Sequence, residues 1–423
     1  MNTVTAEKLL YGGDALARRD DGKAIFIPYA VPGDKLLIEI SSEKKNYARA
    51  KILEVLMPGK WRVTPICPYF EKCGGCCWQH IEYSWQVEAK RLILEELFHH
   101  RFPEARRLEI TMRPCPRPFG YRSRARVQMQ VEAVSEPPLS FSRSHVLAKI
   151  RKDEIRKKTA VGFFRGSSHI VEDVENCLLF RPRLNDALRA LRQIPFKSFS
   201  KNIQDSIHEI DIACSEDEGK WAKGGDGTLL QRKVGDFSYN ISAESFFQAN
   251  DFMIDSLVSH VLDCVSNTET GAALDLFSGV GLFSLPLSRR FSAVSAVEYS
   301  RESHELCEIN AAEAGVDNLE NNHTDTSKWF DSQPKSRFDC VVLDPPRVGV
   351  STGVMERIDR LDCGTIVYIS CDPHTLARDL ERLDMDRWRI VSITGFDMFP
   401  QTYHFETVVH LTAIKNRNSS GKD

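Results

Sequence analysis

The sequence predicts an α/β protein with a doubly wound sheet in its C-terminal half. Between residues 236 and 423, short apolar runs alternate with helical patterns, which is typical of parallel strands joined by helices. Several runs end abruptly in glycine, aspartate or cysteine before a helix start signal, as buried strands do at one edge of a sheet. The N-terminal stretch has shorter β-like runs broken by glycine and proline, which predicts a separate barrel.

Length and composition favour several domains and a soluble protein. The chain has 423 residues, which is too long for one ordinary core. No apolar run approaches the roughly 20 residues that span a membrane, and the first residues lack the pattern of a signal peptide. We therefore expect a cytoplasmic protein without a membrane partner. Its 12 cysteines are then thiols or metal ligands rather than disulfides.

Residues 1–64 predict a small all-β barrel. Their β-like runs lie at 24–28, 35–40 and 47–52, with glycine and proline turns between them. Small barrels often bind nucleic acid, but many do not. The barrel alone therefore does not assign a function.

Three cysteines follow the barrel at a spacing that suits a metal centre. Cys67, Cys73 and Cys76 form a C-x5-C-x2-C pattern, and adjacent glycines allow tight curvature. Thiolates select iron–sulfur clusters or zinc, and either centre needs a fourth ligand. His80 is close in sequence, and a distant cysteine would serve equally well. The alternative of unrelated reduced cysteines is disfavoured by their dense spacing in a turn.

A basic segment in the middle of the chain indicates a surface that faces a polyanion. From Arg101 to Ala160 there are 15 Lys and Arg against 6 Asp and Glu, a net charge of +9, whereas the whole chain carries −3. Alternation places Arg122, Arg124 and Arg126 on one face of a predicted strand, as in a phosphate-binding stripe. The alternative is a solvated loop, and residues 133–160 have the composition of a charged insertion.

A glycine turn opens the doubly wound part. The predicted strand 272–277 runs into S-G-V-G, and the next strand ends at Glu298, 17 residues after Gly281. In nucleotide sites such a turn lets the backbone approach the ligand, and the acid accepts hydrogen bonds from ribose hydroxyls. The third glycine of the dinucleotide pattern is absent, so a ligand without a pyrophosphate fits better than NAD.

Three chemically active side chains lie at the ends of later strands. Asp344 follows the strand 338–343 and is held by two prolines, and Cys371 follows the strand 365–369. A helix pattern begins directly after Cys371, and a helix N-terminus lowers the pKa of a thiol. Glu406 precedes the last strand. The alternatives are a simple turn at Asp344, an ordinary apolar cysteine and a solvated glutamate.

Together these motifs resemble the S-adenosylmethionine-dependent RNA uracil-5 methyltransferases. The motifs that carry the resemblance are C-x5-C-G-G-C from Cys67, F-x-Q-x-N ending at Asn250, D-L-F-S-G-x-G from Asp275, D-P-P-R from Asp344 and S-C-D-P-x-T-L-x-R-D from Ser370. The resemblance covers nearly the whole chain. It implies a TRAM-like OB β-barrel at 1–64, a central α+β domain with an iron–sulfur cluster and a basic RNA-facing surface at 65–235, and a Rossmann-like class I methyltransferase domain at 236–423.

The resemblance also implies two bound groups. The ligands of a [4Fe–4S] cluster would be Cys67, Cys73, Cys76 and Cys177, which makes zinc and His80 less favoured. S-adenosylmethionine would be held by Gln248, Phe277, Glu298 and Asp344, with Asp325 near the adenine. Leu282 stands where many relatives carry Asn or Thr.

The family's reaction assigns Cys371 as the nucleophile and Glu406 as the general base. Carbon 5 of uracil is a poor nucleophile, but thiolate addition at carbon 6 gives an enolate whose carbon 5 attacks the sulfonium methyl group. A base must then remove the carbon 5 proton so that the cysteine can leave. The target base has to be unstacked, so we expect a single-stranded loop or a flipped nucleotide.

The leading hypothesis is a monomeric enzyme that methylates a uridine of 23S rRNA. The alternative within the class is the T-loop uridine of tRNA. A non-catalytic iron–sulfur RNA-binding protein is a hypothesis of another class, but Cys371, Glu406 and Asp344 argue against it. A small-molecule or DNA methyltransferase would predict neither the cluster nor an RNA-binding barrel.

Overall fold

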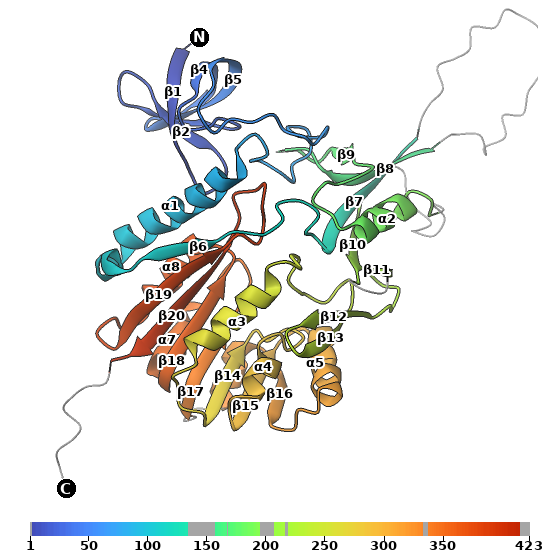
Figure 1. The fold of residues 1–423 in the computed structure, drawn as a ribbon, viewed down its shortest axis with the longest axis vertical. Coiled ribbons are helices and arrows are strands. Elements are labelled where there is room, and N and C mark those ends of the chain that lie inside the picture. The colour runs from blue at the N-terminus through green and yellow to red at the C-terminus, as the bar shows by residue number, and fades with distance from the viewer. Residues whose placement is uncertain are drawn as a thin grey trace, which may run out of the picture.

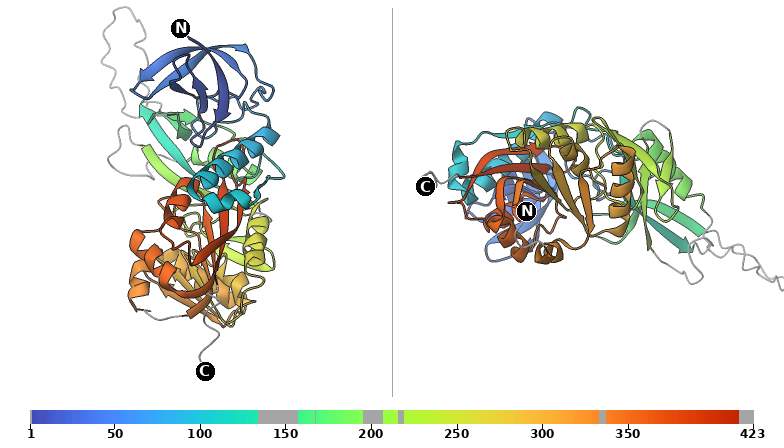
Figure 2. Two further views of the ribbon diagram at one scale, coloured as in Figure 1. Left: turned by 90° about the vertical axis from the view of Figure 1, so that its left-hand side faces the viewer. Right: turned by 90° about the horizontal axis from the view of Figure 1, so that it is seen from below.

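The computed structural model describes residues 2–133, 157–166, 168–194, 207–215, 219–332 and 337–414. The molecule is elongated, with a β-barrel at one end and a large sheet at the other (Figures 1 and 2). Most of the charged insertion predicted at 133–160 lies outside the described residues. Within the described part of the chain, no helix is both long and apolar enough to cross a membrane.

The predicted N-terminal barrel is confirmed. Its strands are β1 (Asn2–Leu9), β2 (Ala15–Arg18), β3 (Ala24–Ile27), β4 (Lys35–Glu43) and β5 (Tyr47–Met57), which close in the order β1-β2-β3-β5-β4. Alternating side chains such as Ile25, Ile27 and Leu36 fill its interior. The buried Asp34 accepts hydrogen bonds from the N–H groups of Val31 and Gly59 at 2.6 and 2.8 Å, which fixes the chain as it leaves the barrel.

Helix α1 (Tyr83–Arg101) lies between the barrel and the large sheet (Figure 1). Lys90 on this helix is fully buried, and its Nζ donates to Asp397 Oδ1 at 2.5 Å and to the Phe399 carbonyl at 3.2 Å. The Tyr83 hydroxyl donates to the other Asp397 oxygen at 2.8 Å. Because both charges are buried, they must stay paired. The pair therefore fixes the position of the loop at 397–405.

The central region contributes a five-stranded antiparallel sheet and several connecting elements. The elements are η1 (Pro103–Arg107), β6 (Ile110–Arg113), β7 (Arg124–Ala133), β8 (Lys157–Phe164), β9 (Val171–Asp173), α2 (Pro182–Leu191), β10 (Ile207–Cys214), β11 (Trp221–Lys223), β12 (Leu230–Val234) and β13 (Phe237–Ile241). The sheet has the order β11-β10-β7-β8-β9, and β12 and β13 form a separate hairpin. Helix α2 packs its apolar face, including Leu184 and Leu188, on the sheet.

The predicted doubly wound sheet is also confirmed. Its elements are α3 (Ile254–Cys264), β14 (Ala272–Leu276), α4 (Ser284–Ser288), β15 (Ala293–Glu298), α5 (Arg301–Glu313), β16 (Leu319–His323), α6 (Thr326–Ser332), β17 (Arg337–Leu343), α7 (Thr352–Arg360), β18 (Asp362–Ser370), α8 (Pro373–Leu380), β19 (Trp388–Phe396) and β20 (Glu406–Ala413). The strand order is β16-β15-β14-β17-β18-β20-β19-β6. Neighbouring side chains such as Val341 and Val342 belong to separate cores on the two faces, as expected of strands covered on both sides.

Two features of this sheet were not expected from the sequence. Strand β20 runs antiparallel to both β18 and β19. Strand β6 pairs in parallel with β19 at the edge of the sheet, although it lies within the segment 65–235. The division of the chain at residues 64 and 235 stays a prediction.

Candidate active site and cysteine pocket

Cys371 follows directly after β18 and precedes the first turn of α8. The Asp372 carboxylate caps that helix, because it accepts the N–H groups of His374 and Thr375 at 2.9 and 3.1 Å. Ser370 Oγ accepts the Asp372 N–H at 3.1 Å. The S-C-D-P sequence thus ends the strand and starts the helix within a few residues. This tight turn leaves Cys371 half-buried at the carboxyl edge of the parallel strands.

A pocket of about 460 Å³ opens at this edge, and we call it the rim pocket. Cys371 and Glu406 both line it, together with Gln248, Arg347 and the three arginines of the predicted stripe. Glu406 reaches the same edge because β20 is antiparallel to β18, so that Thr407 is the register partner of Ser370. The structure therefore brings the predicted nucleophile and the predicted base into one pocket.

The carboxyl groups of the site are buried close together. Glu406 is only 3% exposed, and its Oε2 has no hydrogen-bond partner among the described residues. Burial and the charge of Asp344 raise the pKa of Glu406 well above its usual range, while Arg347 opposes this shift. Burial also raises the pKa of Asp344, whose Oδ2 accepts a hydrogen bond from Gln248 Nε2 at 3.5 Å. Two carboxylates in this environment disfavour each other's ionisation.

The environment of the Cys371 thiol differs from the expectation. Burial, followed by the charge of Glu406, raises the pKa of Cys371 to about 12, and Asp344 and Asp372 act in the same direction. Arg347 lowers it but does not compensate. The lowering of this pKa expected from the helix N-terminus is therefore outweighed by burial and three nearby carboxyl groups.

The other predicted cofactor residues lie at the ends of adjacent parallel strands. Phe277, Glu298 and Asp325 follow or end β14, β15 and β16, next to Asp344 after β17. Glu298 Oε2 accepts the Gly279 N–H at 2.9 Å. Asp325, which was expected near the adenine, caps α6, since its Oδ1 accepts the Ser327 N–H at 2.9 Å.

The glycine turn after β14 has the close packing that the sequence indicated. Gly281 has a φ of +89°, and an added Cβ would lie 2.6 Å from Leu285 Cδ1 and 2.9 Å from Cys307 Sγ. Phe277 also has a positive φ, of +62°, a strained conformation for an aromatic residue. Sequence reasoning did not single out Asp275, which is fully buried beneath this turn. Its Oδ2 accepts the Ser284 hydroxyl at 2.5 Å, and burial raises its pKa to about 7.

The predicted arginine stripe is only partly on one strand, because Arg124 and Arg126 lie on β7 and Arg122 precedes it, and its members have different roles. All three side chains line the rim pocket. Arg124 donates to the carbonyls of Ala243, at 2.9 Å, and Ser245, so it holds the segment that leads to Gln248. Arg126 is exposed and pairs with Asp211 at 3.0 Å. The predicted phosphate-binding role therefore does not fit Arg124, whose guanidinium is bound to backbone carbonyls.

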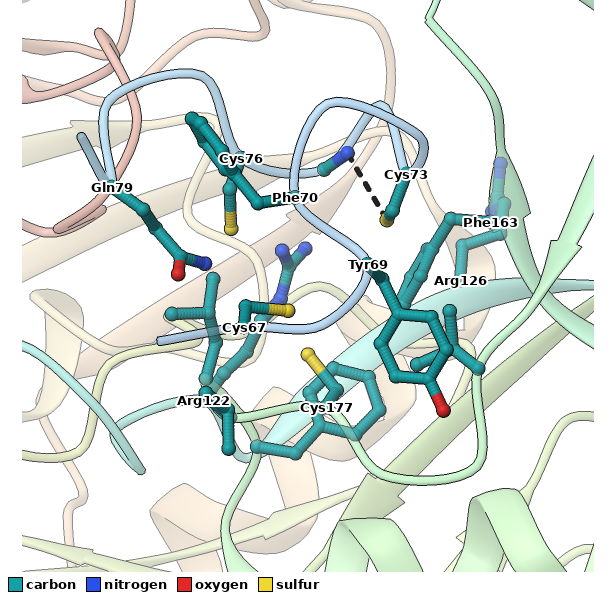
Figure 3. A pocket seen from close by; sticks show the side chains of 15 residues that line it. Cys67, Tyr69, Phe70, Cys73, Cys76, Gln79, Arg122, Arg126, Phe163 and Cys177 are labelled. Carbon is teal, nitrogen blue, oxygen red and sulfur yellow. Dashed lines mark hydrogen bonds between the residues drawn. The ribbon is translucent and has the colours of Figure 1, made fainter. Parts of the chain in front are cut away.

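The four predicted cluster cysteines line a second pocket, of about 160 Å³, which we call the cysteine pocket. Figure 3 shows Cys67, Cys73, Cys76 and Cys177 around it. Its wall includes aromatic side chains, which are Tyr69, Phe70, Phe163 and Phe180. Asn185 holds the Cys177 backbone through two hydrogen bonds, at 2.8 and 3.0 Å.

The nearby alternative ligands point elsewhere. His80 is buried beside the barrel, with Nε2 at 3.4 Å from the Ala30 carbonyl, and Cys77 packs against the barrel core. Neither residue lines the cysteine pocket. Within the described residues, however, no group of three or more His, Cys, Asp or Glu side chains is positioned to hold a metal ion. The four thiols therefore share a pocket without forming a preassembled ligand set.

Comparison with known proteins identifies the family. A family model for tRNA (uracil-5-)-methyltransferases matches residues 226–414, and a model for the TRAM domain matches residues 3–53. The 23S rRNA (uracil(1939)-C(5))-methyltransferase RlmD of Shewanella sediminis is 29% identical over 96% of this chain and 94% of its own. Residues 226–414 of the chain belong to the RNA uracil-5 methyltransferases. A 28% identical RNA methyltransferase of Thermotoga maritima, described as uncharacterized, matches over 97% and 99% of the two chains.

A solved structure has the same fold as this methyltransferase. The crystal structure of the Pyrococcus abyssi tRNA (uracil-54, C5)-methyltransferase in complex with S-adenosyl-L-homocysteine superposes with a TM-score of 0.71. It covers 97% of this chain and 100% of its own, at 22% sequence identity. The family model and the relatives make the protein an S-adenosylmethionine-dependent enzyme that acts on RNA, and the hypotheses of a non-catalytic protein and of a small-molecule or DNA methyltransferase are set aside.

The strand ends of the methyltransferase fit S-adenosylmethionine. The tight turn at Gly281 lets a ligand approach the backbone, and Glu298 offers a carboxylate beside it. Glu406 in the rim pocket and the buried Asp344, whose charge acts on it, suit the positive charge of a sulfonium group. Leu282 is buried, and its carbonyl accepts the Tyr239 hydroxyl at 3.1 Å, so this position contributes packing.

Proposed function

We propose that this methyltransferase modifies carbon 5 of a uridine in 23S rRNA through a covalent adduct between Cys371 and carbon 6 of the base. The observation that supports this most is the rim pocket, in which Cys371, Glu406 and the stripe arginines meet. The pocket volume, about 460 Å³, suits one unstacked base with part of the methyl donor. Arg122 and Arg126 at the same pocket suit the phosphates of the attached RNA.

The mechanism follows from the side chains of the pocket. The Cys371 thiol first loses its proton to solvent. The thiolate sulfur then forms a bond to carbon 6, and the electrons of the carbon 5–carbon 6 double bond move toward oxygen 4. S-adenosylmethionine, when bound, supplies the methyl group that carbon 5 takes up. Glu406 then removes the proton from carbon 5, the double bond re-forms, and the Cys371 sulfur leaves. We propose that Gln248, Phe277, Glu298, Asp325 and Asp344 hold the methyl donor.

The choice of 23S rRNA rests on relatives rather than on the pocket. Two of them, from Shewanella sediminis and Shewanella halifaxensis, are named as 23S rRNA methyltransferases. The T-loop uridine of tRNA is the second candidate, because the family model and the Pyrococcus abyssi structure carry tRNA names. Both substrates require the same chemistry, so the site geometry does not distinguish them.

Mapping of 5-methyluridine in a deletion strain tests the substrate. We expect one 5-methyluridine to disappear from 23S rRNA, with tRNA unchanged, because the gene product acts on the ribosomal uridine. The wild-type gene should restore the modification, and a Cys371→Ala copy should not. Loss of the modification from tRNA alone would contradict the proposed substrate and favour the second candidate.

We further propose that Cys67, Cys73, Cys76 and Cys177 bind a [4Fe–4S] cluster. Four thiols around one aromatic-walled pocket match the donor set that such clusters use. The cluster would brace the central sheet against the segment at 67–80. Reduced thiols and an iron–sulfur cluster suit a cytoplasmic enzyme. We also propose that the enzyme is a monomer.

Iron analysis of anaerobically purified protein tests the cluster. We expect about four irons per chain in the wild-type enzyme. Cys177→Ser should lose most of the iron and the visible absorption, because it removes a ligand. Cys77→Ser is the matched control and should keep both. A Cys177→Ser protein with full iron content would contradict the assignment.

A further inference from the structure

The turn between β1 and β2 of the barrel reaches the candidate nucleophile. The Tyr11 hydroxyl donates a hydrogen bond to the carbonyl of Cys371 at 3.2 Å. The two residues are 360 positions apart in the chain. Tyr11 lies in the segment that matches the TRAM domain, so the barrel contributes a side chain to the backbone of the S-C-D-P turn.

The Tyr11 ring also contacts the segments on both sides of the rim pocket. Its centroid lies 5.2 Å from that of His374, in the first turn of α8, at an edge-to-face angle of 62°. It lies 5.2 and 6.0 Å from the rings of Tyr403 and Phe405, again in edge-to-face geometry. Phe405 directly precedes Glu406. One side chain therefore packs against the segment that carries the nucleophile and the segment that carries the base.

The turn that presents Tyr11 is held firmly in place. The Gly13 carbonyl accepts the indole N–H of Trp78 at 3.0 Å. A Cβ on Gly13, whose φ is +97°, would lie 3.1 Å from Tyr403 Cδ1 and 3.2 Å from Cys77 Sγ. The N–H of Cys77 in turn donates to the Gln401 carbonyl at 3.2 Å. The turn is thus packed between the cysteine segment and the loop at 397–405.

We propose that Tyr11 is a positioning residue for methyl transfer, so that the barrel forms part of the catalytic site as well as a module for RNA binding. This inference rests on the proposed role of Cys371 as nucleophile. The hydrogen bond fixes the orientation of the Cys371 peptide, and the direction of the thiol follows from that orientation. A thiol that points away from carbon 6 attacks a bound base more slowly, but it does not weaken the binding of that base.

Tyr11→Phe tests this role, because it removes the hydroxyl and keeps the ring. We expect the single-turnover rate of adduct formation with 5-fluorouridine RNA to fall about fivefold, when it is normalised to the final amount of adduct. A fivefold change corresponds to the net contribution of one neutral hydrogen bond. The KM for RNA and the melting temperature should remain close to those of the wild type. Tyr47→Phe is the matched control, because Tyr47 lies on the same barrel, is 38% exposed and packs against Phe26.

The possible outcomes separate the two proposals. If the wild-type enzyme forms the adduct and Tyr11→Phe forms it at the same rate, the positioning role is contradicted. A slower Tyr11→Phe enzyme whose KM for RNA rises in proportion contradicts it as well, because the barrel then acts through RNA binding alone. A wild-type enzyme that transfers methyl groups but forms no adduct contradicts the Cys371 mechanism itself.

Discussion

Replacement of Cys371 by alanine is expected to abolish both methyl transfer and the covalent adduct with 5-fluorouridine RNA. No other cysteine of the described chain lines the rim pocket, so no thiol can take over the attack on carbon 6. The loss should be on the order of 10,000-fold or more, as for other essential nucleophiles. Radiolabelled methyl transfer and a denaturing gel of the protein–RNA adduct measure the two effects.

The control for this experiment is Cys363→Ala. Cys363 lies at the opposite end of the same strand β18 and is buried. Its replacement should leave adduct formation intact, although the small cavity lowers stability somewhat. Methyl transfer by Cys371→Ala near the wild-type rate would rule out the nucleophile assignment.

The same adduct assay has an expected pH dependence. The pKa of Cys371 is about 12 in the free enzyme, so the reactive thiolate is a minor species at neutral pH and increases with pH. The rate of adduct formation should therefore rise between pH 7 and pH 9.

Glu406→Gln is expected to trap the methylated enzyme–RNA adduct on ordinary RNA. The amide has nearly the same shape as the acid but cannot take up the carbon 5 proton, so the cysteine cannot leave. Turnover should fall by roughly 100-fold to 10,000-fold, while the first methyl transfer still occurs. Mass spectrometry of the intact adduct should show RNA bound to Cys371 and carrying one additional methyl group.

A matched control is Glu381→Gln, because Glu381 lies at the C-terminal end of α8, the end opposite Cys371, and pairs with Arg101 on the surface. It should turn over normally and accumulate no adduct. Free turnover by Glu406→Gln would remove Glu406 from the role of base. Because the pKa of Glu406 is raised, this carboxyl group must lose its own proton before it can act as the base. The turnover rate of the wild-type enzyme should therefore also increase with pH.

The sequence predicted the strands and their ends well, because these depend on local signals. Apolar runs, the glycine turn and the Asp-Pro helix start each act within a few residues, and they placed Glu298, Asp344 and Cys371 at one edge of the sheet. The spacing of Cys67, Cys73 and Cys76, together with the family resemblance that added Cys177, likewise led to four thiols in one pocket.

The features that the sequence did not predict depend on distant segments. The raised pKa of Cys371 results from burial and from carboxyl groups on other strands. Arg124 is occupied by carbonyls 119 and 121 residues away, so strand alternation could not reveal its role. The contact of Tyr11 with Cys371 requires the barrel to dock on the sheet, and no local pattern encodes that docking.

The antiparallel direction of β20 has a consequence for the synthesis of the enzyme. The proposed nucleophile is delivered by β18, but the proposed base arrives only when β20 pairs beside it, near the end of the described chain. A nascent chain still attached to the ribosome through residues just beyond 371 therefore carries the thiol without its proton acceptor. Under the proposed mechanism, such a chain cannot complete a turnover on nearby RNA until β20 has been made.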